Sequence, residues 1–134
     1  MNKVRRAAKK LRKDLRGNIS LISLMEYAQK IGYRVVFYNT VEGDKVLDLY
    51  DLKSAAESTT AFTVSDTYNK LIFVDDTAHI QDKLYVLLHE LGHIVLSHIG
   101  TGKISIMDKK LLEAEAEAFL YEVITHNNIL CIPQ

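Results

Sequence analysis

The chain has 134 residues, of which 48% are hydrophobic and 25% charged, and its Lys and Arg equal its Asp and Glu in number. This length and composition predict one soluble globular domain over residues 1–134, and they exclude a disordered or fibrous chain. No apolar run approaches the roughly 18 residues that a membrane span needs, so we expect no membrane association.

The first part of the chain is strongly basic. Residues 1–16 hold eight Lys and Arg against one acidic residue, Asp14, a net of +7, so the rest of the chain carries −7. A nucleic-acid-binding arm is one interpretation, but residues 1–17 have no aromatic side chain for base stacking. We therefore favour a basic helix or arm that faces solvent or the protein's own acidic body, and we do not expect direct nucleic-acid binding.

The same segment lacks the apolar stretch of a secretory signal. The single cysteine, Cys131, permits no intrachain disulfide, which suits a reducing compartment. Both features predict a cytoplasmic protein.

Apolar spacing and turn residues predict the order helix, helix, strands, helix, helix. After the basic segment, a helix should follow Ser20 and end near Gly32, and residues 33–39 should form a strand. Segments 60–66 and 70–76 predict an antiparallel hairpin, whereas residues 44–58 fit either a short strand or a helix.

Two helical patterns complete the chain. The first runs from about Asp82 to His98, with Gly100 and Gly102 ending it, and the second runs from about Asp108 to about His126. The whole order predicts an α+β fold with a small, mostly antiparallel sheet that is packed on helices and covered on one side.

The first of these helices contains the pattern H-E-x-x-H at His89, Glu90 and His93. Residues four apart lie on the same face of a helix, so both imidazoles can bind one zinc ion while Glu90 acts as general base. The alternative is a buried helix with two satisfied core histidines. Burying two imidazoles and a carboxylate among apolar neighbours is costly unless a cation pairs with them, so we favour the metal site.

A catalytic zinc site normally has three protein ligands and one open position. A third histidine in the extended form of the pattern would stand at position 99, with glycine at 96, but the chain has Ile99 and Leu96. His98 is one residue short and is expected to be a capping or surface residue near the helix end.

The other common third ligand is a glutamate of the following helix. Glu115 has apolar neighbours at helical spacing, and a lone carboxylate on an apolar stripe needs a cation. Glu113 is flanked by lysines and should face water. We therefore expect Glu115 to be the third ligand, with a boundary position on an amphipathic helix as its alternative. Gly92 would let a neighbouring backbone approach the metal-binding helix closely.

The stretches HELGHIVLSH at 89–98 and EAEAEAFL at 113–120 resemble the ImmA/IrrE metallopeptidases of bacteria, phages and mobile elements, whose second motif is E-x-E-A-x-x-F-A. The resemblance spans roughly residues 20–125, and Leu120 departs from the usual small residue. It implies a zincin-like fold, one Zn²⁺, and Glu115 as third ligand, because this is the glutamate directly before the alanine. It also implies a protein or peptide substrate such as a helix-turn-helix transcriptional repressor.

Together these features predict a zinc metallo-endopeptidase in which Glu90 takes a proton from the attacking water and passes it to the leaving amine. The substrate strand is expected to pair with an exposed edge of the small sheet, with the 70–74 strand as the candidate edge. Candidates for stabilising the oxyanion are Tyr85, Tyr121, His79 and His126. The alternative function is a zincin domain that binds a regulator without cutting it, around a structural zinc. Glu90 argues against this, because structural sites usually close with a fourth ligand.

Overall fold

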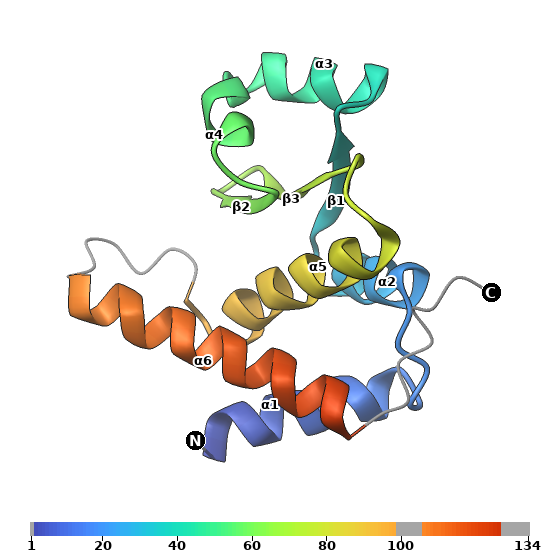
Figure 1. Ribbon diagram of the computed structural model, residues 1–134, viewed down its shortest axis with the longest axis vertical. Coiled ribbons are helices and arrows are strands. Elements are labelled where there is room, and N and C mark those ends of the chain that lie inside the picture. Colours follow the sequence, from blue (N-terminus) through green and yellow to red (C-terminus); the bar gives the residue numbers. More distant parts are fainter. Residues whose placement is uncertain (1, 99–105, 127–134) are drawn as a thin grey trace.

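The computed structural model describes residues 2–98 and 106–126, which form six helices and three strands (Figure 1). In chain order they are α1 (Asn2–Asp14), α2 (Leu21–Lys30), β1 (Arg34–Tyr38), α3 (Val41–Leu49), α4 (Lys53–Glu57), β2 (Ala61–Ser65), β3 (Lys70–Asp75), α5 (Ile80–Val95) and α6 (Ile106–Thr125). The segment that fitted strand or helix is thus helical. Gly100, Gly102 and Cys131 lie outside the described residues.

The sheet has the order β1-β3-β2, with β3 in the centre. The predicted hairpin is confirmed, since β2 and β3 pair antiparallel, with Thr63 opposite Ile72. Strand β1, however, runs parallel to β3, so the fold is α+β as predicted but its sheet is mixed rather than mostly antiparallel. The chain passes through α3, α4 and β2 between the two parallel strands, which is the long connection that parallel pairing requires.

Helices cover both faces of the sheet, so the prediction of a sheet covered on one side is wrong (Figure 1). Val36, Tyr38 and Phe73 point to one face, where Leu47 of α3 joins them in a small core. Ile72 and Val74 point to the other face and into the main core, beneath α2 and α5. Alternation along the strands therefore divides their apolar residues between two cores.

The basic segment forms α1, which lies along α6 (Figure 1). Val4, Ala8 and Leu11 are fully buried at helical spacing, and they bury the apolar face of α1. Two ion pairs link this helix to α6: Lys3 Nζ lies 3.2 Å from Glu115, and Arg5 Nε lies 3.6 Å from Glu122. Part of the basic charge is therefore turned toward the protein's own carboxylates.

No helix in residues 2–98 or 106–126 combines the length and apolar character that a membrane crossing requires.

Candidate metal centre

Helix α5 carries the H-E-x-x-H pattern beside the sheet. Its fully buried face, formed by Leu84, Leu87, Leu88 and Leu91, packs into the main core and fixes the rotation of the helix. The rings of His89 and His93 then project together toward α6, with their Nε2 atoms 3.2 Å apart. The predicted pairing of these two imidazoles is present in the structure.

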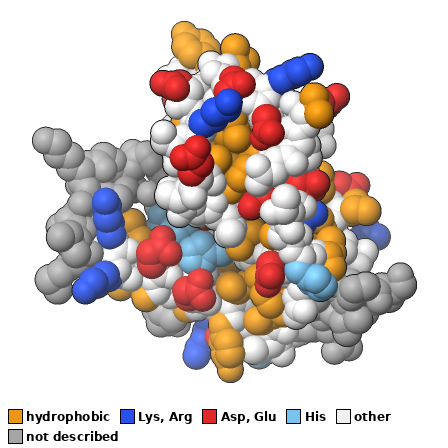
Figure 2. Space-filling view, turned by 45° about the horizontal axis from the view of Figure 1, so that its top comes forward, with side chains coloured by type: hydrophobic (Ala, Val, Ile, Leu, Met, Phe, Trp, Pro, Cys, Tyr) orange, Lys and Arg blue, Asp and Glu red, His pale blue; other side chains and the backbone are white. Residues whose placement is uncertain are grey.

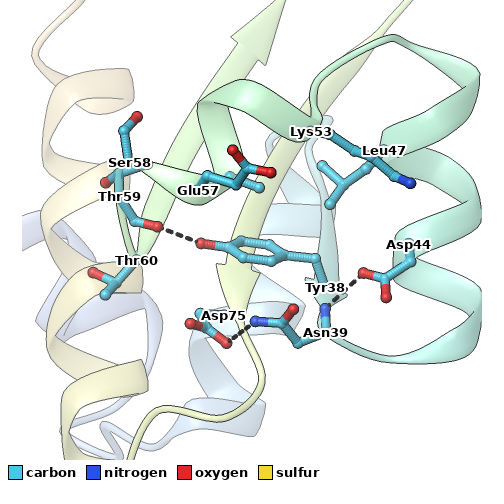
Figure 3. A pocket seen from close by; sticks show the side chains of 11 residues that line it. Tyr38, Asn39, Asp44, Leu47, Lys53, Glu57, Ser58, Thr59, Thr60 and Asp75 are labelled. Atoms are coloured by element: carbon cyan, nitrogen blue, oxygen red, sulfur yellow. Dashed lines mark hydrogen bonds between the residues drawn. The ribbon is translucent and has the colours of Figure 1, made fainter.

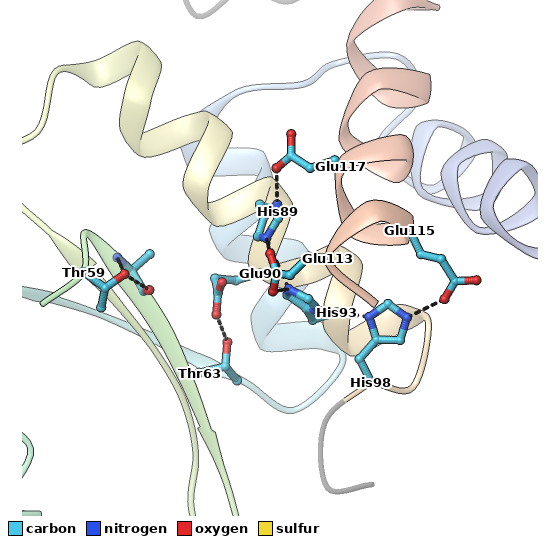
Figure 4. Close-up of polar contacts among 10 residues, drawn as sticks. Thr59, Thr63, His89, Glu90, His93, His98, Glu113, Glu115 and Glu117 are labelled. Atoms are coloured by element: carbon cyan, nitrogen blue, oxygen red, sulfur yellow. Dashed lines mark hydrogen bonds and ion pairs between the residues drawn. The ribbon is translucent and has the colours of Figure 1, made fainter. Parts of the chain in front are cut away.

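Glu113 of α6 completes the group. Its Oε2 lies 3.0 Å from His89 Nε2 and its Oε1 lies 2.9 Å from His93 Nε2 (Figure 4). One ligand atom from each of the three residues falls within 4.8 Å of the others, which is close enough to hold a single metal ion. Two imidazoles and one carboxylate are also a known ligand set of catalytic zinc.

Glu115 lies elsewhere, and the expectation that it would meet the two histidines is wrong. Its carboxylate is 2.9 Å from His98 Nε2 and 3.2 Å from Lys3 Nζ of α1 (Figure 4). The buried stripe of α6 follows Ala116, Phe119 and Val123. Glu113 flanks that stripe on the side of α5, and Glu115 flanks it on the side of α1, because residues two apart on a helix point in nearly opposite directions.

The ionisation of these carboxylates differs with their surroundings. Burial alone would raise the pKa of Glu115. The hydrogen bond from His98 and the contact with Lys3 lower the pKa by more than burial raises it, so it lies below the ordinary value. Burial raises the pKa of Glu90, and a hydrogen bond from Thr63 opposes that shift. Burial lowers the pKa of His93, which favours the neutral ring that binds metal.

Glu90 lies next to the group and is held by the sheet. Thr63 Oγ1 of β2 donates to Glu90 Oε1 at 2.6 Å (Figure 4). Sequence patterns did not predict that Thr63 belongs to the site. Only its place in a strand beside the motif helix could have pointed to it, and that contact depends on the tertiary fold.

A cleft between β2 and α6 runs past the group formed by His89, His93 and Glu113. One cavity of about 470 Å³ is lined by Tyr85, Val86 and Leu120, and a second of about 370 Å³ is lined by Phe62 and Leu112. The two cavities share Ala61, Glu90 and Glu113 as lining residues. Figure 2 shows histidine side chains recessed here, with acidic side chains beside them.

The strand that borders this cleft is β2. The expectation that a substrate would lie along the 70–74 strand is wrong, because β3 is the central strand and is paired on both sides. Within the described residues, the outer edge of β2 pairs with no other strand. Its backbone N–H and C=O groups can therefore receive an extended peptide.

Comparison with protein families assigns the chain. The model of the IrrE N-terminal-like domain, peptidase M78, matches residues 28–133, which is most of the chain. The chain belongs to this family. Searches of curated proteins and of solved structures gave no match. The resemblance to ImmA/IrrE metallopeptidases is thus confirmed, and the fold is a metallopeptidase-like α+β domain.

In this M78 domain, further side chains contact the two histidines from outside the group. Glu117 Oε1 lies 2.7 Å from His89 Nδ1, and His98 Nδ1 lies 2.9 Å from His93 Nδ1. His98 is only 6% exposed, so the prediction of a surface residue is wrong. Such outer contacts orient metal-binding rings in other proteins.

The four oxyanion candidates are spread over the M78 domain. Tyr85 lines the 470 Å³ cavity, where its hydroxyl accepts from Gln81 Nε2 at 2.9 Å. His79 instead caps α5, His126 pairs with Glu122, and Tyr121 is 63% exposed. Tyr85 is therefore the one candidate of the four that lines either cavity of the cleft.

A further cavity, of about 700 Å³, lies at the ends of β1 and β3 (Figure 3). Tyr38 crosses it and donates to the backbone oxygen of Thr59 at 2.6 Å. Burial, with a contribution from Asp75, raises the pKa of Tyr38 to about 12. Thr59 and Thr60 also line the 470 Å³ cavity, so the two spaces adjoin at the start of β2. His89, His93 and Glu113, the group that can hold a metal, do not line the 700 Å³ cavity.

Proposed function

We propose that the chain is a zinc-dependent endopeptidase in which His89, His93 and Glu113 hold one Zn²⁺ and Glu90 is the general base. The single observation that carries this proposal is the convergence of three ligand atoms beside the half-buried Glu90, next to the outer edge of β2, which pairs with no strand in the described residues. Three protein ligands leave a position open, as catalytic zinc requires.

When bound at such a site, zinc activates water and polarises a carbonyl. The chain's own residues supply the rest. Glu90 accepts a proton from the attacking water at a carboxylate oxygen and delivers it to the amine that leaves when the peptide C–N bond breaks. Thr63 donates to Oε1 of Glu90, which fixes the carboxylate beside the cleft and leaves Oε2 for this proton.

The substrate would bind as an added strand on β2, with alternate side chains entering the two cavities. Their lining differs: Tyr85, Val86 and Leu120 contribute to one, and Phe62, Leu112 and Lys109 contribute to the other. The apolar parts of both linings would suit apolar side chains, and Lys109 would favour an acidic group nearby. We propose a cytoplasmic regulatory protein as substrate, with a helix-turn-helix repressor of a phage or mobile element as the first to test.

The test compares Glu90→Gln with the wild type and with Glu122→Gln, which removes a carboxylate from the far side of α6. Zinc content is measured by elemental analysis, and each protein is incubated with a candidate repressor. Mass spectrometry then detects new chain ends. We expect Glu90→Gln to keep its zinc and to lose about 10²–10⁴-fold in cleavage rate, while Glu122→Gln cleaves normally.

Two results would contradict the proposal. Cleavage by Glu90→Gln at the wild-type rate would exclude Glu90 as base. Stable binding of the repressor by the wild type, without any new chain end, would favour a binding module with a structural zinc. DNA retention that falls steeply with salt and disappears when residues 1–16 are removed would instead indicate a nucleic-acid-binding protein.

A further inference from the structure

A chain of hydrogen bonds leads away from His93 and ends on α1. His93 Nδ1 lies 2.9 Å from His98 Nδ1, and His98 Nε2 lies 2.9 Å from Glu115 Oε1. The other oxygen of Glu115, Oε2, lies 3.2 Å from Lys3 Nζ. Figure 4 shows His98 between His93 and Glu115, on the side away from Glu90.

The end of α5 explains why His98 lies there. Ser97 adopts a left-handed conformation, with φ of 62°, and its N–H bonds to the carbonyl of Ile94 at 3.0 Å. The N–H of His98 bonds to the carbonyl of His93 at 2.8 Å. This pair of bonds is a Schellman motif, which turns the chain back over the last helical turn. His98 is thereby returned to the side of His93.

The protons in this chain can be assigned from the ligand geometry. His93 faces the other ligand atoms through Nε2, so a neutral His93 that binds metal carries its proton on Nδ1. That proton is donated to Nδ1 of His98, which must then carry its own proton on Nε2. His98 Nε2 donates in turn to Oε1 of Glu115, whose other oxygen lies 3.2 Å from Lys3 Nζ. Each donor therefore meets an acceptor.

Burial shields the hydrogen bonds of His98 and Glu115 from water. The side chain of His98 is 3% exposed and that of Glu115 is 14% exposed, whereas Glu117, the partner of His89, is 64% exposed. A hydrogen bond shielded from water is electrostatically stronger than an exposed one. The buried chain should therefore hold the ring of His93 more firmly than Glu117 holds the ring of His89.

We propose that His98 and Glu115 are positioning residues that fix the ring and tautomer of His93 for metal binding, and that Lys3 of α1 supports them by holding Glu115. This rests on the proposed function. Helix α1 precedes residues 28–133, the part of the chain that the family model matches. The support from Lys3 therefore comes from a helix that the family match does not cover.

The experiment measures the Zn²⁺ dissociation constant of the full chain by competition with a chromophoric chelator, together with the stability of the metal-free protein in urea. His98→Phe removes both hydrogen bonds, while His98→Gln retains an acceptor for His93 and a donor for Glu115. We expect His98→Phe to bind zinc about 10–100-fold more weakly than the wild type, and His98→Gln to recover part of that loss.

Because His98 is buried, a second variant avoids the core. Glu115→Gln removes the charge that accepts from His98, and Glu122→Gln is its matched control, since Glu122 pairs with Arg5 of α1 as Glu115 pairs with Lys3. We expect weaker zinc binding in Glu115→Gln and unchanged binding in Glu122→Gln. Lys3→Met should weaken binding in the same direction, and Arg5→Met should not.

Equal zinc affinity in the wild type, His98→Phe and Glu115→Gln would overturn this inference and leave the proposed peptidase intact. Equal losses in Glu115→Gln and Glu122→Gln would also overturn it, because the effect would then come from general loosening of α1 against α6. Unchanged affinity in Lys3→Met would overturn the support assigned to α1. A wild-type chain that binds no zinc would overturn the proposed function as well.

Discussion

Gly92 sets the distance between the two helices that form the metal group. A Cβ at this position would lie 3.0 Å from Phe119 Cδ2, 3.4 Å from Phe119 Cγ and 3.5 Å from the Cα of Ala116. Carbon atoms in contact prefer about 3.5–4.0 Å, so the ring of Phe119 would have to move by about half an ångström. That ring is fully buried, so its movement would disturb the close packing around it. The sequence-based expectation of a close approach at Gly92 is confirmed.

The magnitude for Gly92→Ala follows from two opposing effects. Alanine is favoured over glycine inside a helix by about 1 kcal/mol. Overpacking of a filled core costs about 1–3 kcal/mol. The difference leaves the variant less stable by about 0–2 kcal/mol, with a lowered Tm of roughly 3–5 °C at the midpoint of that range. Any separation of α5 from α6 also moves Glu113 away from the two histidines, so zinc affinity should fall.

Equilibrium unfolding in urea measures the change in stability, and the background variant Phe119→Leu tests its cause. If the Phe119 ring is the obstacle, Gly92→Ala should cost at least about 0.5 kcal/mol less in that background than in the wild type. The reasoning would be refuted if Gly92→Ala raised the stability of the wild type by about 1 kcal/mol. That gain would mean that helix propensity alone operates and that the helices have room for a methyl group.

Three further predictions concern other parts of the molecule. Ser97→Gly should raise the free energy of unfolding, measured in urea, by about 0.5–1 kcal/mol. Glycine adopts the left-handed conformation of this position without strain, and this gain exceeds the cost of the greater freedom that glycine loses on folding. A loss of stability would contradict this prediction. For Asp75, burial alone would raise the pKa. Hydrogen bonds from Asn39 and Thr77 lower the pKa by more than burial raises it, so it lies below its ordinary value. The resulting stabilisation is present above the unfolded pKa of about 3.9 and is lost as the pH falls through the folded value. The stability difference between wild type and Asp75→Asn should therefore shrink below about pH 4, and a difference that is constant down to pH 2 would refute the assignment. Glu113→Gln should weaken zinc binding by more than the roughly 10–100-fold that loss of an outer contact costs, as measured by chelator competition. Wild-type zinc affinity in this variant would exclude Glu113 as a ligand.

Local sequence patterns were sufficient to predict those parts of the fold and site that depend on residues close together in the chain. The β2–β3 hairpin followed from two apolar segments around a polar turn, and the pairing of His89 with His93 followed from a spacing of four residues on a helix. Residues 44–58 could not be assigned to a strand or a helix in this way. The small core that holds α3, with Leu47 against Phe73, joins residues distant in sequence, so apolar spacing within the segment does not reveal it.

The placement of His98 shows a second limit of local reasoning. A histidine after the last turn of an apolar helix normally reaches solvent, and the sequence contains nothing that excludes this. The left-handed conformation at Ser97, a position where glycine is usual, turns His98 back into the structure. At the end of α2, Gly32 adopts a similar conformation, with φ of 92°, and that end was correctly predicted. A serine in the glycine position hides the same turn from a sequence-based prediction.

The misplacement of Glu115 has a more specific cause. A carboxylate on an apolar stripe needs a cation, but the sequence does not show which cation it meets. Helix α6 packs against α5 on one side and α1 on the other, so the carboxylates flanking its stripe divide between two partners. Glu113 faces imidazoles that can hold a metal, and Glu115 faces Lys3. The second cation, Lys3, comes from the basic N-terminal segment. When both cations are considered, Glu113 and Glu115 are equal candidates in the sequence, and only the packing of α1, α5 and α6 separates them.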